Sequence, residues 1–234
     1  MSSGTLTRQV LTLLALLPAL AAAQAPEGKL YTPGAFERLD VAGAAEVKLT
    51  QGESDQVFVI GDARTQKNVQ VELSGRRLLI RSTDSWKFWN TSRLQVEVQM
   101  RAMTHLMLSG ASDLHAPAAF KTEQLSVSIS GAGQVRFDEL TAEHLRFGIS
   151  GAGDGLLRGQ VGTLSLDVSG KGKLMAEDLR ARQARVSISG IGNASLWVTE
   201  DLRVSVSGVG SVDYWGKPQV QRSSSGMASI SGHG

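Results

Sequence analysis

A four-residue phrase, Ser-Gly-x-Gly, returns about every twenty residues through the second half of this 234-residue chain. Full copies stand at 130–133, 150–153, 169–172, 189–192 and 207–210, and a looser copy, Ser-Gly-Ala-Ser, stands at 109–112. A nearly constant period of this length is typical of a solenoid, in which each repeat buries its apolar face against its neighbours alone. The repeat therefore predicts a stack of similar coils.

Apolar residues alternate with polar ones on both sides of the phrase. The residues one and three before each serine are apolar, as are most of those five and seven after it. This period of two, rich in β-branched residues, predicts two short strands per repeat, joined at the Gly-x-Gly bend. The position directly before the serine holds Leu108, Ile129, Ile149, Val168, Ile188 and Val206.

Like strands recur one coil later and run in the same direction, so they should stack in parallel about 4.8 Å apart. The sequence thus predicts an all-β, single-stranded parallel β-helix whose coils have about twenty residues. A leucine-rich repeat is the main rival of similar period. Its Leu/Asn consensus is missing, and no copy contains a helical segment.

The serines and glycines of the phrase are expected to form one corner of each coil. A sharp corner requires either positive φ or close packing of stacked backbones, and glycine permits both. The serines should point outward or into the corner, where their hydroxyls can bond one another or the amides of the bend. The predicted corner residues are Ser130, Gly131, Gly133, Ser150, Gly151, Gly153, Ser169, Gly170, Gly172, Ser189, Gly190, Gly192, Ser207, Gly208 and Gly210.

The chain divides into four segments. Residues 1–23 have the pattern of a secretory signal, with Arg8 before an apolar run and a cleavage site near Ala23. A membrane anchor is the alternative, but the run is short for a span. We expect a linker at 24–35, the β-helical domain at 36–228 and a tail at 229–234. These features predict a periplasmic, secreted or cell-surface protein with no membrane-spanning segment after cleavage.

Within the domain, the first coil should begin near Phe36, with Ala42 in the place of the corner serine. The alternating runs between residues 56 and 82 break the period, so they should form wider coils or a hairpin on the stack, with a tight turn at Ser74-Gly75. Near the other end, Gly226 follows Gly208 by 18 residues, which indicates one last imperfect coil.

Charge and cysteine content exclude several classes of function. The chain has 24 basic residues, of which Arg8 lies in the signal, so 23 remain against 22 acidic ones. A nucleic-acid partner is not expected, since such binding needs a net basic face. The sequence has no cysteine, which excludes disulfides, a catalytic thiol and a lipidated cysteine.

The pattern resembles a bacterial family, the GIN domain of the autotransporter adhesin head. The resemblance rests on the opening Phe36-x-x-Leu39-x-Val41-x-Gly43, on the strand pairs from residue 57 to 80, and on the tandem phrases at 129–133 and 149–153. It covers about residues 36–228. The resemblance implies a right-handed β-helix in an exported bacterial protein, with adhesion suggested by the family's name. It implies no catalytic residue.

Three aromatic residues, Trp86, Phe88 and Trp89, crowd into an otherwise polar stretch at 84–93. Exposed aromatic rings can stack on sugar rings or anchor a protein interface, so these residues are the candidate binding site for a glycan or a cell-envelope protein. The alternative is that they close the side of the helix or cover one of its ends.

A catalytic carboxylate pair would have to come from neighbouring coils. Neither outward column places two acids on adjacent coils, although Asp113 with Asp154, or Asp138 with Glu177, would stand two coils and about 9.6 Å apart. Glycosidases need about 5–9.5 Å. The four histidines share no column, so no metal site or cofactor is predicted.

The sequence therefore favours an exported, non-enzymatic binding protein of the adhesin or cell-envelope type. One alternative is a polysaccharide lyase or hydrolase that works on the side of the β-helix. Another is a purely structural envelope protein that associates edge to edge through its terminal coils.

Overall fold

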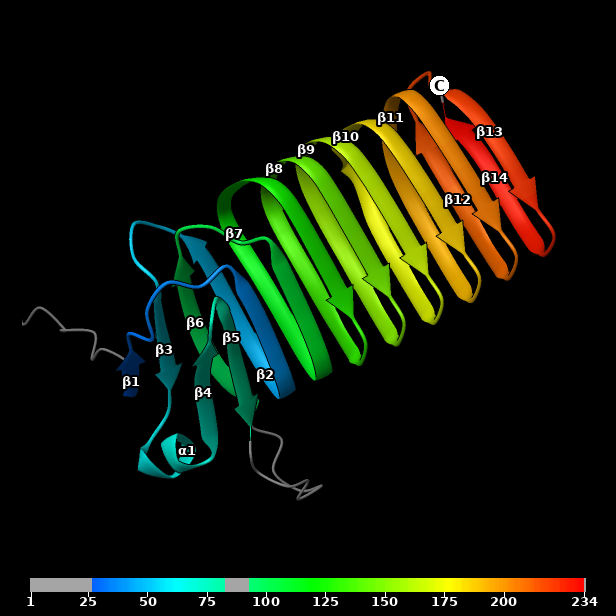
Figure 1. Ribbon diagram of the computed structural model, residues 1–234. Helices are drawn as coiled ribbons and strands as arrows, with labels where there is room; N and C mark the ends of the chain where they lie inside the picture. Colours follow the sequence, from blue (N-terminus) through cyan, green and yellow to red (C-terminus); the bar gives the residue numbers. More distant parts are fainter. Residues whose placement is uncertain (1–26, 83–92, 234) are drawn as a thin grey trace, which may run out of the picture.

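The computed structural model describes residues 27–82 and 93–233, and these residues form a β-helix (Figure 1). Its elements are β1 (Gly28–Tyr31), β2 (Arg38–Gln51), β3 (Gln56–Ile60), α1 (Ala63–Lys67), β4 (Val69–Ser74), β5 (Arg77–Ser82), β6 (Leu94–Met100), β7 (His105–Ile129), β8 (Ala132–Ile149), β9 (Ala152–Val168), β10 (Lys171–Ile188), β11 (Ile191–Val206), β12 (Val209–Trp215), β13 (Gln219–Ser224) and β14 (Met227–His233). The predicted all-β fold is confirmed.

The coils stack in parallel, in the order β2, β7, β8, β9, β10, β11, then β12 with β13, then β14. Each strand from β8 to β11 starts just after one Ser-Gly corner and ends just before the next, so it runs once around the helix. The register is that of the repeat: Leu145 lies beside Leu164, and Val186 beside Val204. The pairing slips only at the broad turn opposite the corner, for example between Phe137 and Leu140.

The predicted inward columns form one continuous core. Every residue directly before a corner serine, from Leu108 to Val206, is at most 2% exposed. Additional side chains from the broad turn, such as Leu140 and Leu179, complete the core on that side. Burying this column of aliphatic side chains is the main favourable term for a chain without disulfides.

The N-terminal end is covered by strands that leave the regular stack. β5 and β6 pair in parallel with β2, on the side away from β7. β4 adds to β5 as an antiparallel hairpin, and β3 and then β1 add to β6 in the same way. The expected first coil is confirmed, since Ala42 pairs with Ser109. The expected linker boundary is wrong, because Gly28–Tyr31 pairs with β3 instead of lying outside the fold.

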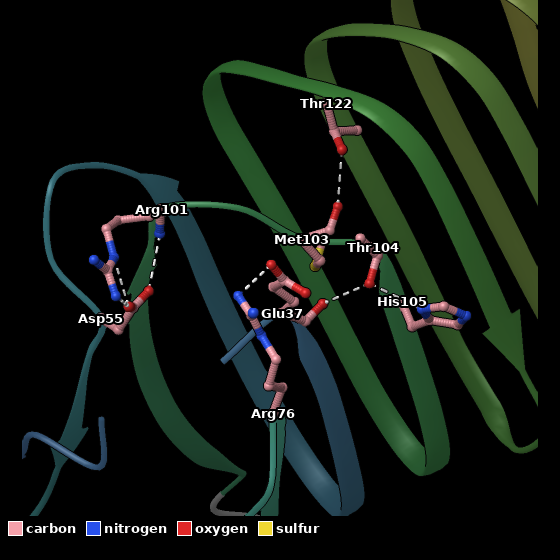
Figure 2. Close-up of polar contacts among 8 residues, drawn as sticks. All are labelled: Glu37, Asp55, Arg76, Arg101, Met103, Thr104, His105 and Thr122. Carbon is pink, nitrogen blue, oxygen red and sulfur yellow. Dashed lines mark hydrogen bonds and ion pairs between the residues drawn. The ribbon is translucent and has the colours of Figure 1, made fainter. Parts of the chain in front are cut away.

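The chain crosses from this cap back to the stack between β6 and β7 (Figure 2). Asp55, whose side chain is 3% exposed, accepts hydrogen bonds from the backbone and the guanidinium of Arg101. Thr104 donates its amide to the carbonyl of Glu37 at 2.8 Å, and Thr122 donates its hydroxyl to the carbonyl of Met103 at 3.0 Å. These contacts fix where the regular coils begin.

The C-terminal end of the stack is formed by β13 and β14 and extends farther than expected. Residues 229–233 belong to β14, which pairs in parallel with β12, so they are not a separate tail. Two polar residues occupy inward columns here: Arg222 lies beside Val204, and Ser224 beside Val206. An inward charge at an open edge opposes further strand addition. The sequence left open that the protein associates edge to edge through its terminal coils. The polar residues at this end disfavour such association.

The corner glycines stack backbone against backbone. The carbonyl oxygen of Gly131 accepts the amide of Ala152 one coil later, and a Cβ on Gly151 would lie 2.1 Å from that same oxygen. The same clash, at 1.9–2.0 Å, would occur at Gly170, Gly190 and Gly208. Among the described corner glycines, positive φ occurs only in the first two coils, at Gly43 and Gly110. Close approach is thus the reason for glycine in the later coils.

The corner serines use their hydroxyls differently from the expectation. Ser109, Ser130 and Ser189 are positioned to donate to backbone carbonyls of the preceding coil, at 3.3–3.5 Å, and not to one another or to the amides of the bend. The amides are already engaged: Ser130, for example, donates its N–H to the carbonyl of Leu108. The carbonyls, which have a second lone pair, are the acceptors left to the hydroxyls.

The substitution Gly151→Ala should lower the free energy of unfolding by about 2 kcal/mol, because the new Cβ meets two carbonyl oxygens of the preceding coil within 2.6 Å. Gly148→Ala, in the same coil, is the matched control. Its Cβ would have no neighbour closer than 3.8 Å, so it should raise stability by about 0.5 kcal/mol. Urea unfolding of both variants checks this; equal losses would contradict the stacking explanation.

In one coil, a glycine compensates for a large aromatic residue inside the core. From β2 to β12, the column of Phe147 otherwise holds Val or Leu, and the column of Gly155 otherwise holds Leu, Val or Ala. A Cβ on Gly155 would lie 2.7 Å from the ring of Phe147 and 2.6 Å from Leu174. The missing side chain of Gly155 therefore makes room for the ring.

We expect Gly155→Ala to cost about 1–3 kcal/mol in the wild-type chain and clearly less in the Phe147→Leu background. The two sites are in contact, so a coupling of at least about 0.5 kcal/mol should appear in a double-mutant cycle measured by denaturant unfolding. Simple additivity of the two costs would show that Gly155 is needed for another reason.

Candidate functional site

The predicted aromatic site, Trp86, Phe88 and Trp89, lies outside the described residues. The described residues on either side of it, Ser82 and Arg93, have defined contacts with the first coils. Ser82 lies against Gly43, where a Cβ on the glycine would meet the Ser82 Cβ at 3.2 Å, and Arg93 forms an ion pair with Asp113. Ser82 and Arg93 therefore both lie on the corner side of the first coils.

A shallow groove follows the corner over several coils, and its polar side chains include Asp113, Gln134, Asp154, Lys173 and Asn193. The acidic and amide side chains in this row bind backbone. Asp113 accepts the amide of Gln134 at 2.8 Å, and Asp154 accepts the amide of Lys173 at 3.1 Å. Asn193 accepts the amide of Ser211 in the same way, at 3.3 Å. Each acceptor tethers the next coil.

This arrangement changes how the pair Asp113 and Asp154 is interpreted. The side-chain amide of Asn193 takes the same structural role two coils after Asp154, so an oxygen acceptor that is not an acid serves equally well at this position. Asp113 is also paired with Arg93. Both carboxylates are therefore engaged in contacts within the protein.

The second acidic pair lies near the broad turn. Asp138 is bound by Arg136 at 2.7 Å and by His115 at 2.7 Å. Hydrogen bonds from Arg136 and then from His115 hold the pKa of Asp138 below its usual range. A general acid in glycoside cleavage needs the opposite shift. One oxygen of Glu177 is buried without a hydrogen-bond partner in the part of the chain that the structure describes.

Over the described ranges, no group of three or more His, Asp or Glu side chains is close enough together to hold a metal ion. The same residues contain no helix that is long and apolar enough to span a membrane.

The two flat sides of the coils carry charge in different ways. The side that follows each corner, here called the paired face, carries several ion pairs. Lys48 pairs with Glu97 at 3.1 Å and Arg136 with Asp138, while Arg158 reaches both Asp138 at 3.7 Å and Asp178 at 3.2 Å. These exposed pairs neutralise part of the paired face and contribute little stability each.

The side that precedes each corner, here called the arginine face, carries a column of basic residues four positions before each serine. The column runs through Arg38, His105, Ser126, Arg146, Ser165, Arg185, Arg203 and Gln221, which the register of neighbouring strands aligns. From the sequence, these positions were predicted only to be outward and mostly polar. The recurrence of arginine at one position of the repeat could have indicated a basic column.

Comparison with known proteins agrees with this architecture. Residues 35–218 match the family model described as "Putative auto-transporter adhesin, head GIN domain". No curated protein matches the chain.

Several solved structures have the same fold. A crystal structure described as a putative adhesin from Bacteroides fragilis is 23% identical, with a TM-score of 0.82, and the match covers 90% of this chain and 98% of that one. A putative adhesin from Parabacteroides merdae is 18% identical, with a TM-score of 0.69 and coverage of 91% and 98%. A putative lipid binding protein from Parabacteroides distasonis is 19% identical, with a TM-score of 0.67 and coverage of 91% and 98%.

At such low identity the structural likeness concerns the fold alone, whereas the family model spans most of the chain, from the residue before Phe36 to Pro218. The corner phrase, the opening strand and the resemblance drawn from the sequence lead to the same family. This chain belongs to the GIN-domain family of autotransporter adhesin heads.

Proposed function

We propose that this protein is an exported, non-enzymatic binding protein of the adhesin type, which uses the side wall of its β-helix to contact a glycan or an envelope protein. The observation that carries the proposal is the set of contacts that the outward acids make within the protein. Of the four acids that could have formed a catalytic pair, Asp113 and Asp154 hold backbone amides of the next coil, and Asp138 sits in an ion pair with arginine, so each pair has at least one member committed to a structural contact. What remains is a long, regular surface suited to contact.

The names of relatives support a binding role without giving a ligand. Two of the similar structures are described as adhesins and one as a lipid binding protein. Export is supported by the leader-like sequence of residues 1–23. Identification of the N-terminal residue of the protein recovered from cells tests the expected cleavage near Ala23.

The direct test is an array of surface glycans and envelope proteins probed with the purified mature chain. Adhesin-type binding predicts saturable signals from a restricted set of ligands. A blank array, together with turnover in the assays described next, would favour the enzymatic alternative.

The polysaccharide lyase or hydrolase alternative predicts new reducing or unsaturated ends when the chain is incubated with uronate or neutral glycans. We expect none. We also expect Asp113→Asn and Asp154→Asn to keep the wild-type melting temperature within about 2 °C, since an amide oxygen can accept the same backbone hydrogen bond. Asp154→Ala is the control that removes the acceptor and should lower it. Turnover abolished by either asparagine variant would contradict the structural assignment.

The aromatic residues Trp86, Phe88 and Trp89 remain the proposed anchor for a ligand selected on the array. The double substitution Trp86→Ala with Trp89→Ala should weaken binding by about tenfold or more, since stacked aromatic contacts contribute strongly to recognition. The melting temperature should stay unchanged. A collapse of the melting temperature with no loss of affinity at permissive temperature would show that these rings cover the stack and bind nothing.

A further inference from the structure

We infer that the arginine face binds a polyanionic polysaccharide, one with a carboxylate or sulfate on its repeating sugars, laid along the axis of the β-helix. The inference deepens the proposed binding function and rests on it. It is carried by Arg146, Arg185 and Arg203, which are exposed and stand in one column of the stack.

The spacing of the column suits a linear polymer. Arg185 and Arg203 are direct neighbours on adjacent strands, and Arg146 stands two strands from Arg185. With strands about 4.8 Å apart, the cations recur at multiples of that distance along a straight line. A chain of sugar rings presents its charges at a similar, regular interval. A guanidinium can grip a carboxylate or sulfate through two parallel hydrogen bonds.

These arginines have no carboxylate partner among the described residues. Three acids share the face: Asp40 pairs with Arg77, Asp201 accepts a hydrogen bond from Gln183, and Asp167 pairs with no arginine of the column. Arg203 contacts only the side-chain oxygen of Gln221, at 3.2 Å. Like charges directly opposite each other on neighbouring strands destabilise a sheet. The column of Arg185 and Arg203 therefore has a repulsion that a bound polyanion would relieve.

Small neighbours leave the guanidinium groups accessible. On the same face, the outward positions two residues further along the strands hold Gly148, Asp167, Ser187 and Ser205. Beside each of the three arginines this row therefore holds glycine or serine, which leaves that side of the guanidinium groups open to a ligand. The serine hydroxyls can bond the uncharged hydroxyl groups of a sugar.

A membrane surface fits this face less well than a glycan does. Attachment to a bilayer combines basic residues with apolar or aromatic side chains that enter the interface. The exposed large apolar residues Ile191, Val209 and Met227 lie at the corner, outside the arginine column. On the arginine face itself the exposed large apolar residue is Met107, two coils from Arg146.

The test compares two triple variants of the mature chain that remove the same charge. The first is Arg146→Ser, Arg185→Ser and Arg203→Ser, which introduces the residue that Ser126 and Ser165 already provide in this column. The control is Lys171→Ser, Lys173→Ser and Lys217→Ser, which removes three exposed cations elsewhere. Affinity is measured by calorimetry with polygalacturonate, dextran sulfate and neutral dextran, at low and at physiological ionic strength.

We expect the wild-type chain to bind at least one of the two charged polymers and not neutral dextran, with an affinity that falls as salt rises. Three exposed charge contacts, each worth a factor of about two to three, predict about a tenfold loss for the arginine variant. The lysine variant should stay within about twofold. The arginine variant should melt at the wild-type temperature or above, since repulsion within the column is removed, whereas arginines with a purely structural role would lower it.

Equal losses in both variants would overturn the inference, because they would reflect net charge and not the column. So would binding of phosphatidylglycerol vesicles or duplex DNA at least as tight as that of the polymers and equally dependent on the arginines. If neither charged polymer binds but the array identifies another ligand, the inference fails and the proposed function stands. A blank array would reject the proposed function itself.

Discussion

The whole structure depends on the contact of backbone with backbone at the Ser-Gly corner. Each first glycine lies on a carbonyl oxygen of the preceding coil, at a distance that admits no side chain. This contact lets the coils approach to the ordinary spacing of parallel strands while the chain turns sharply. Because the corner fixes the register of every coil, residues at the same offset from the serine form straight columns, inside as core and outside as surface.

The ends of the stack solve the problem of open strand edges in two ways. At the N-terminal end β5 and β6 pair in parallel with β2, and the antiparallel strands β4, β3 and β1 then cover their outer edges. At the C-terminal end the last coil keeps the parallel pairing but places Arg222 and Ser224 in inward columns. A cap and a polar inner face both discourage addition of further strands.

The outer columns show that identical positions in a repeat need not share a role. On the paired face, acids hold backbone amides of the next coil or neutralise arginines, so their charge is used within the protein. On the arginine face the cations face solvent with no carboxylate partner among the described residues. The two faces have the same backbone geometry, but the column of arginines that a charged ligand could bind lies on the arginine face. The search for a ligand is therefore best directed to that face.

The sequence by itself determined the strands, the corner, the inward columns and the family, because these follow from spacing along the chain: Ile129, Ile149 and Val168 are buried for the same local reason. It could not place Gly28–Tyr31 in the cap or residues 229–233 in β14, since their pairing depends on which strand edge is left open in space. It also gave Asp154 as a candidate acid. Only the tertiary structure brought the carboxylate to the amide of Lys173 and left Arg185 beside Arg203, because side-chain contacts between coils depend on register and distance across some twenty residues of chain.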